Sequence, residues 1–228
     1  MSTKAPNPPE RPGKKNDQII SYYELRMLIG GAGILLPILL FFGKLIFNGS
    51  TQIEYSISDY YDNGTAGDIL VGVLFALCFF LLSYRGYDAI DSKAANLGCV
   101  FALGVALFPT TSDNPWVHKL HFVFALLLFS VFIFFCIYLF RRSDPRNPCT
   151  KQKETRNKAY LVCGIIMIVC IVGVAICSFL LEELSANYNL VFWLETIALI
   201  TFGFSWITKA EFLFWKDDDT LEKKAQLE

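Results

Sequence analysis

Lysine and arginine are missing from three stretches of this 228-residue chain, residues 48–67, 110–115 and 182–189. The segments that alternate with these stretches hold eighteen of the twenty basic residues, and the remaining two are Lys44 and Lys119. Alternation of basic and non-basic loops is typical of polytopic membrane proteins, in which the basic loops stay on the cytoplasmic side. The missing positive charge therefore indicates a membrane protein and predicts its orientation, with the three stretches as outer loops.

The signatures of several catalytic classes are also missing. The sequence has no Gly-x-Ser-x-Gly elbow, no glycine-rich phosphate loop with its lysine, and no dinucleotide fingerprint. It has only two histidines, His118 and His121, whereas a catalytic zinc site usually has three protein ligands. We therefore expect no cofactor and no metal. Zinc stays open as an alternative if Asp59, Asp62 or Glu195 supplies the third ligand.

Cysteine is absent from the three outer loops. Six of the seven cysteines fall within apolar runs, and Cys149 lies in a basic segment, so no disulfide is expected on the outer side. Cys163, Cys170 and Cys177 recur at intervals of seven residues, which places them along one helix face. We interpret this face as a small-residue packing seam between transmembrane helices.

Long apolar runs are what the sequence has in abundance. Apolar residues make up 54% of the chain and aromatic residues 15%. A helix needs about 20 residues to cross a hydrocarbon core of about 30 Å. Six runs reach or approach this length, and the sequence therefore predicts an all-α, six-helix transmembrane bundle. The predicted spans are Met27–Phe47, Ile69–Tyr84, Ala94–Phe108, Trp116–Phe140, Tyr160–Leu181 and Leu190–Thr208.

The domain organisation follows from the spans. An even number of spans with basic segments at both ends predicts that both termini are cytoplasmic. Residues 1–26, rich in proline and basic residues, are expected to form a disordered cytoplasmic tail, and residues 213–228 a charged cytoplasmic tail. Residues 27–212 then form one transmembrane domain. Internal repeats and a charged residue near the middle of a span are both missing, which argues against a carrier.

Polar residues near the outer ends of the spans are the candidate functional residues, because ionisable groups in a membrane are costly and usually functional. Glu195 lies about five residues inside the last span, roughly 8 Å along the helix. His118 and His121 open the fourth span on one helix face, and Asp68 opens the second. The first outer loop adds Ser56, Ser58, Asp59 and Asp62, and the second adds Asp113. We expect these groups to surround one outward-facing cavity.

Each candidate also has a purely structural interpretation. Asp68 at a helix start is favoured by the helix dipole, and Asp113 with Asn114 is typical of a helix N-cap. His118 would then hydrogen-bond a loop carbonyl, and Glu195 would be a neutral acid bonded to a neighbouring helix. These structural alternatives are kept for all candidates.

The polar positions resemble a known family. The landmarks are a Ser-x-Ser pattern (Ser56, Ser58), Arg85 closing the second span, His118 opening the fourth, and Leu194-Glu195 in the last. This arrangement, across residues 27–212, is similar to the family that joins the Golgi protein of GPI-anchor lipid remodelling with the damage-regulated autophagy modulators and bacterial relatives. The resemblance implies involvement with lipids, and for the GPI branch acyl-chain remodelling on the outer side of the membrane, whereas the autophagy branch has no agreed chemistry. The matching residues are Ser56, Ser58, His118 and Glu195. The long polar N-terminal tail and the Tyr-Tyr-Asp insertion after Asp59 depart from the GPI branch, which leaves the substrate open.

Two functions are consistent with these observations. The first is a lipid acyltransferase or hydrolase, with His118 as general base or acid, Glu195 orienting it, and Ser56 or Ser58 as nucleophile. Asp59, Asp62, Asp68, Asp113 and His121 would help to bind the substrate. The second is a non-enzymatic membrane protein that binds lipid or a partner protein. Membrane lipids are the expected partners, nucleic acid is not, and the resemblance to bacterial relatives places the chain in a bacterial inner membrane.

Overall fold

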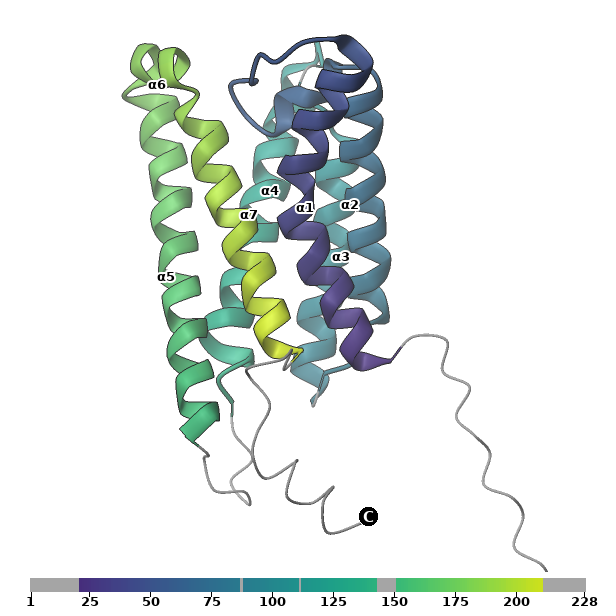
Figure 1. Ribbon diagram of the computed structural model, residues 1–228, viewed down its shortest axis with the longest axis vertical. Helices are drawn as coiled ribbons and strands as arrows, with labels where there is room; N and C mark the ends of the chain where they lie inside the picture. The colour runs from purple at the N-terminus through teal and green to yellow at the C-terminus, as the bar shows by residue number, and fades with distance from the viewer. Residues whose placement is uncertain (1–20, 87, 111, 143–150, 211–228) are drawn as a thin grey trace, which may run out of the picture.

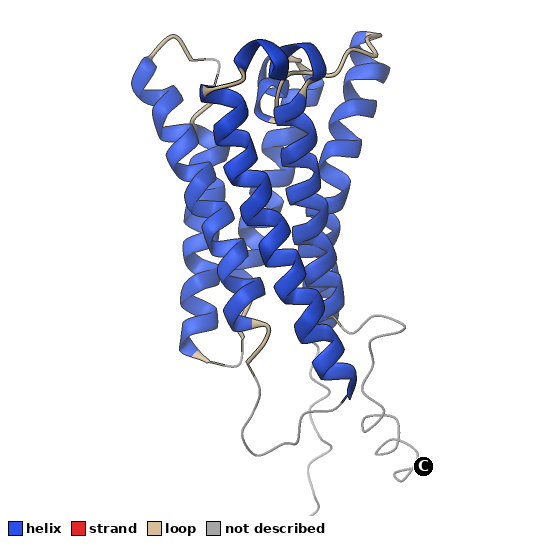
Figure 2. Cartoon of the chain, turned by 90° about the vertical axis from the view of Figure 1, so that its left-hand side faces the viewer, coloured by secondary structure: helices blue, strands red, loops and turns tan. Residues whose placement is uncertain are grey.

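The computed structural model describes residues 21–86, 88–110, 112–142 and 151–210. Within these ranges the chain is helical without any strand, and six helices are long and apolar enough to cross a membrane (Figures 1 and 2). The prediction of an all-α six-helix bundle is confirmed, and the architecture is that of an integral membrane protein. The elements are α1 (Tyr22–Asn48), η1 (Ser58–Asp62), α2 (Thr65–Ser83), α3 (Ala89–Leu107), α4 (Pro115–Phe134), η2 (Phe135–Leu139), α5 (Lys151–Phe179), α6 (Glu182–Tyr188) and α7 (Leu190–Lys209).

The long helices form a ring around an apolar core. Helix α1 packs between α2 and α7, α3 packs between α2 and α4, and α5 packs against α7 and α4. Phe132 of α4 and Phe202 of α7 stack across the centre with ring centroids 3.7 Å apart. Large apolar side chains such as Leu35, Phe42 and Val169 cover the outside of the ring, where a lipid bilayer would surround them.

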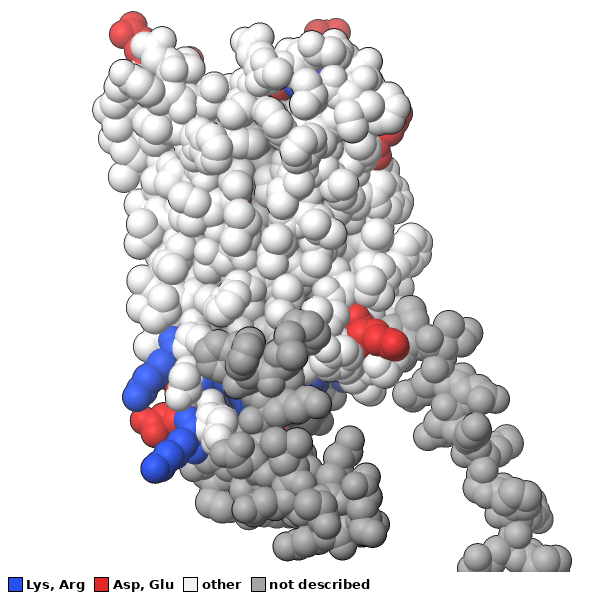
Figure 3. Space-filling view, viewed as in Figure 1, with Lys and Arg blue, Asp and Glu red and all other residues white. Residues whose placement is uncertain are grey.

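The two ends of the bundle carry different charges. We call the end with residues 49–64, 108–114 and 180–189 the upper end, and the opposite end the lower end, as drawn in Figure 1. Helix α1 starts and α7 finishes at the lower end, where the Arg26 guanidinium donates to the Lys209 carbonyl over 3.1 Å. On the face drawn in Figure 3, blue basic side chains gather at the lower end, and the charges seen at the upper end are mostly acidic.

Some predicted boundaries were wrong for identifiable reasons. Helix α1 begins at Tyr22, inside the predicted tail, because Ser21 and Glu24 form a capping box with bonds of 2.8 and 3.2 Å. Helix α5 begins at Lys151, because its charged first turns continue the helix beyond the apolar run. Helix α6 was not predicted. Residues 1–20, Cys149 and residues 211–228 lie outside the described residues.

Glycines let the first and last helices approach closely. A Cβ atom at Gly30 would lie 2.7 Å from the Gly203 carbonyl oxygen, and one at Gly203 would lie 2.4 Å from that of Gly30. Gly30 therefore lies at a close helix contact, and Gly33 likewise faces Phe202 at 2.7 Å. Gly31 faces open space instead.

Cysteines on α5 also pack inward. Cys163, Cys170 and Cys177 are all buried, as expected for a packing seam. The part of the chain that the structure describes contains six cysteines, and all of them are free thiols.

Candidate functional site

The first upper loop folds over the end of the bundle as an ordered segment. Gly49 ends α1 with φ 66°, and Gly64 precedes α2 with φ 52°, conformations that glycine adopts without steric cost. Between them, η1 turns the chain at Ser58–Asp62, and Asn63 and Gly64 connect it to α2. The serines and aspartates of this loop are therefore held at defined positions.

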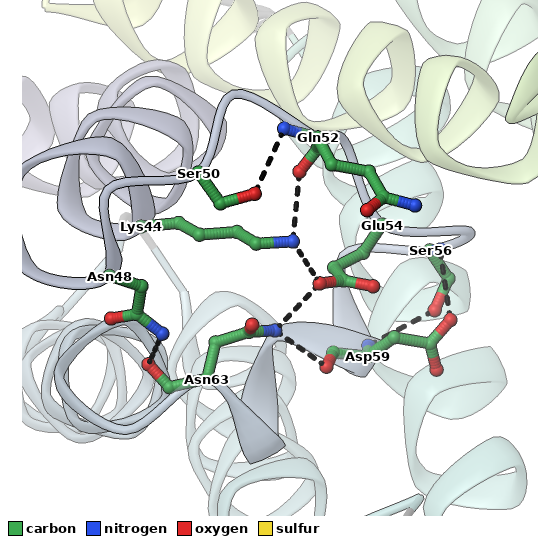
Figure 4. A network of polar contacts seen from close by, with 8 residues as sticks. All are labelled: Lys44, Asn48, Ser50, Gln52, Glu54, Ser56, Asp59 and Asn63. Carbon is green, nitrogen blue, oxygen red and sulfur yellow. Dashed lines mark hydrogen bonds and ion pairs between the residues drawn. The ribbon is translucent and has the colours of Figure 1, made fainter.

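Lys44 holds this loop from below (Figure 4). Its ammonium, on the last turns of α1, is buried and pairs with the Glu54 carboxylate. The same nitrogen donates to the Gln52 carbonyl over 2.8 Å, and Asn63 Nδ2 donates to Glu54 Oε1 over 2.9 Å. A buried charge needs a partner and further hydrogen bonds, and this network supplies both. Lys44 is thus a structural exception to the lack of basic residues at this end.

The loop is also bonded to α7. The Ile57 N–H donates to Glu195 Oε2 over 2.7 Å, and the Phe192 N–H donates to the Tyr55 carbonyl over 2.9 Å. The Ser185 hydroxyl of α6 donates to the Tyr55 hydroxyl over 3.2 Å. Glu195 therefore fixes the backbone of the residue that precedes Ser58.

Ser58 lies against His121, which is 1% exposed. Ser58 Oγ and His121 Nε2 are 2.8 Å apart, and His121 Nδ1 is 2.7 Å from the Phe108 carbonyl oxygen. The Tyr61 ring meets the imidazole edge to face at 6.0 Å, and the Tyr61 hydroxyl donates to the Val105 carbonyl. A hydroxyl, an imidazole and a carbonyl thus form one hydrogen-bonded chain between η1, α4 and the end of α3.

Ser56 and Asp59 bond to each other. The Ser56 N–H donates to Asp59 Oδ2 over 3.0 Å, and the Asp59 N–H donates to Ser56 Oγ over 3.2 Å. Burial raises the pKa of the Asp59 carboxyl from its ordinary value, and nearby Glu54 and Asp62 act in the same direction, whereas the bonds from Ser56 lower it. The Ser56 hydroxyl therefore closes a turn, whereas the Ser58 hydroxyl meets the imidazole.

Other predicted site residues lie apart from this chain of bonds. His118 is exposed, and its Nδ1 is 2.6 Å from the Thr110 carbonyl oxygen, the contact expected from its structural interpretation. Asp62, Asp68 and Asp113 are exposed, and the cap of α4 is Asn114, whose Oδ1 accepts from the Trp116 N–H over 3.0 Å. Arg85 lies at the lower end, after α2.

The sequence contains a pattern that could have identified His121, rather than His118, as the buried histidine. Its spacings to Leu128, Phe132 and Phe135 are seven, eleven and fourteen residues, which place all four on one face, and all four are buried. The network of Lys44 and Glu54 and the carbonyl of Phe108 had no comparable sequence pattern, because they depend on how the loops fold back.

Both nitrogens of the His121 ring contact protein oxygen atoms. Among residues 21–86, 88–110, 112–142 and 151–210, no three histidine, cysteine or acidic side chains group closely enough to hold a metal ion. The contacts of both His121 nitrogens, to Ser58 and to Phe108, also account for its ring without a metal.

Fold and site together define a class, a six-helix membrane protein with a polar site at one end of the bundle. Comparison with protein-family models, with curated proteins and with solved structures finds no match to this chain. Function is therefore inferred from the geometry of the site.

Proposed function

We propose that this integral membrane protein binds and remodels lipids in the extracytoplasmic leaflet, with its upper end as the site. The proposal keeps both termini cytoplasmic, in a bacterial inner membrane, and keeps the family resemblance described from the sequence. The basic lower end supports this orientation, because positively charged segments remain in the cytoplasm.

One observation carries the proposal: hydrogen bonds join the first upper loop, which carries the Ser58 hydroxyl, to an imidazole of α4 and to a carboxylate of α7. Ser58 comes from the first upper loop, His121 from α4 and Glu195 from α7, and hydrogen bonds of 2.7–2.8 Å connect the loop to the other two. Such groups are costly to place in a membrane-spanning bundle, and where they occur they usually serve a function. Acyl transfer and ester hydrolysis are reactions that a hydroxyl beside an imidazole performs.

A non-enzymatic role, as a binder of lipid or of a partner protein, has an observation in its favour. The bonds of Lys44, Glu54, Asn63 and Glu195 all tie the first upper loop to the bundle, which a binding protein would also need. In that case the loop would present a fixed surface, and no lipid would change chemically.

Mass-spectrometric lipid profiling tests the proposal. Host cells without the protein are compared with cells that carry the wild type or Glu195→Gln at matched membrane levels. We expect the acyl composition of one lipid class to change when the protein is removed, and to change in the same direction with Glu195→Gln. Glu195→Gln keeps an acceptor for the Ile57 N–H, so a folded variant is expected, but a neutral amide accepts more weakly than a carboxylate and would hold the backbone before Ser58 less firmly. Identical profiles in all three would reject remodelling and favour the binding role.

A further inference from the structure

We infer that Ser58 and His121 form a nucleophile and base pair that cleaves the acyl ester of a membrane glycerolipid through an acyl-Ser58 intermediate. The inference rests on the proposed function, since it needs a lipid at the upper end. It replaces His118, the base expected from the sequence, by His121.

The partners of His121 determine where its protons lie. A carbonyl oxygen only accepts hydrogen bonds, so the contact of 2.7 Å with Phe108 assigns the proton of the neutral ring to Nδ1. Nε2 then carries the lone pair and accepts from the Ser58 hydroxyl over 2.8 Å. This tautomer is the one that a base needs to remove the hydroxyl proton, and the Phe108 carbonyl takes the orienting position that a carboxylate has in a catalytic triad.

Neighbouring groups hold Ser58 in place. The Thr110 hydroxyl donates to the Ser58 carbonyl over 3.3 Å, and Glu195 binds the N–H of Ile57, the residue before Ser58. Beneath η1, a Cβ atom at Gly67 would lie 2.2 Å from the Tyr61 carbonyl oxygen, so this glycine lets η1 rest directly on α2. A fixed nucleophile spends less entropy on reaching its reactive geometry.

The depth of the pair matches the position of an ester. Trp116 near the start of α4 is 70% exposed, and Lys119 lies over its ring at 5.1 Å, a combination typical of the membrane interface. His121 lies five residues after Trp116, about 7.5 Å along the helix. That depth is close to the boundary between headgroups and hydrocarbon, where the acyl esters of glycerolipids lie. Ser58 as a residue is half-buried, so it is not sealed inside the bundle.

Cleavage of the ester through acyl-Ser58 needs no reagent other than water or a lipid alcohol. Ser58 Oγ bonds to the acyl carbonyl carbon as its proton passes to His121 Nε2. The ester C–O bond then breaks, and His121 returns the proton to the departing lysolipid oxygen. Water or the hydroxyl of a second lipid attacks acyl-Ser58, loses its proton through His121 to Ser58 Oγ, and leaves as a fatty acid or a newly acylated lipid.

The test is covalent labelling of the full chain, purified in detergent, with a long-chain alkyl fluorophosphonate. Ser58 Oγ would bond to phosphorus, fluoride would leave, and the proton would pass through His121 to solvent. Peptide mass spectrometry then measures the labelling rate at each serine. We expect the wild type to be labelled at Ser58, Ser58→Ala to lose the label, and His121→Gln to react about 10²- to 10⁴-fold more slowly. The matched control is Ser50→Ala on the same loop, whose hydroxyl accepts from the Gln52 N–H and which should keep the wild-type rate.

The variants are chosen so that loss of folding is not mistaken for loss of chemistry. In His121→Gln the new side-chain amide can still donate to the Phe108 carbonyl, and the unfolding temperature of each variant is measured alongside its labelling. Absence of the label in the wild type, labelling at another serine, or a normal rate in folded His121→Gln would overturn the pair. A rate that depends on His118→Ala rather than on His121→Gln would also overturn it. Lipid profiling separates this inference from the proposed function. If the profile changes in cells that lack the protein but is normal in cells that carry Ser58→Ala, the Ser58–His121 pair is rejected and the proposed function stands.

Discussion

At the lower end of the bundle Trp206 packs among the rings of Tyr84, Phe135 and Phe140, with centroid distances of 5.0–5.1 Å. At the upper end the covering loop buries Ile57 and Tyr60 and is held in addition by Lys44, Glu54 and other polar groups. Aromatic packing is non-directional and fills space, whereas hydrogen bonds fix individual groups but cost desolvation. From this comparison we expect the Trp206 cluster to contribute more to stability than the polar contacts of the upper loop, which position individual groups.

Trp206→Ala should have the largest effect, because it removes the fully buried ring at the centre of the lower cluster. We expect the free energy of unfolding to fall by about 3–5 kcal/mol, as for other large-to-small changes in cores. Denaturant unfolding in detergent measures this change. The matched control is Trp193→Ala on the same helix, where the ring is 49% exposed on the lipid-facing side. Equal losses for both tryptophans would contradict the proposed difference between the two ends.

Gly67→Ala should act on the upper end. The added methyl would lie 2.2 Å from the Tyr61 carbonyl oxygen, so η1 must move and carry Ser58 away from His121. We expect about 3 kcal/mol of destabilisation, the upper part of the usual range for overpacking. Gly72→Ala on the same helix is the control, because nothing lies within 4 Å of its new methyl. Unfolding measurements on both variants decide the point, and an unchanged Gly67→Ala would contradict it.

Lys44→Met should loosen the first upper loop alone. It leaves the Glu54 carboxylate and the Gln52 carbonyl without their ammonium partner, at a cost of about 2 kcal/mol. Faster hydrogen exchange in residues 50–64, with unchanged exchange in α5 and α7, is the expected result. Adding Glu54→Gln should recover part of the loss, because no charge is then stranded. Lys119→Met, at an exposed lysine, is the control and should leave the exchange of this loop as in the wild type.

Asp59 should give the smallest effect, visible as a pH dependence. Because burial raises the pKa of Asp59, the folded loop binds its proton more tightly than the unfolded loop does. The stability that this proton contributes is complete below the ordinary pKa of aspartate, and it is lost as pH rises through the raised pKa. Asp59→Asn should therefore flatten the pH dependence of loop opening, measured by hydrogen exchange corrected for intrinsic rates. Asp62→Asn, on the exposed part of the same turn, removes only a smaller contribution to the raised pKa of Asp59 and should flatten the pH dependence less.

Much of the fold could be predicted because lipid imposes simple rules on sequence. Membrane spans must be long and apolar, and basic loops lie on the same side of the membrane. The six helices can therefore be predicted from the sequence alone. The charged start of α5 was not predicted, because helical turns outside an apolar run give no hydropathy pattern. The start of α1 could have been found from the capping pattern of Ser21 and Glu24.

The sequence predicted most of the residues of the candidate site, but it did not predict which of them are hydrogen-bonded to each other. The sequence pointed to Ser58, Glu195 and the two histidines near one end of the bundle. Which histidine meets Ser58 depends on the rotation of α4, and which backbone groups meet Glu195 and His121 depends on loops that fold back from distant positions. Their catalytic roles stay predictions that the labelling experiment addresses.

The bonds between the first upper loop and α7 also bear on how the protein is made. Helix α1 enters the membrane early in synthesis, but Ile57 and Tyr55 wait for Glu195 and Phe192, which emerge from the ribosome well over a hundred residues later. The lower end is tied in the same way, from Arg26 to the Lys209 carbonyl. Nascent chains halted before α7 would therefore hold Ser58 on a loop that lacks its bonds to α7, so that the site is completed only when the last helix is inserted.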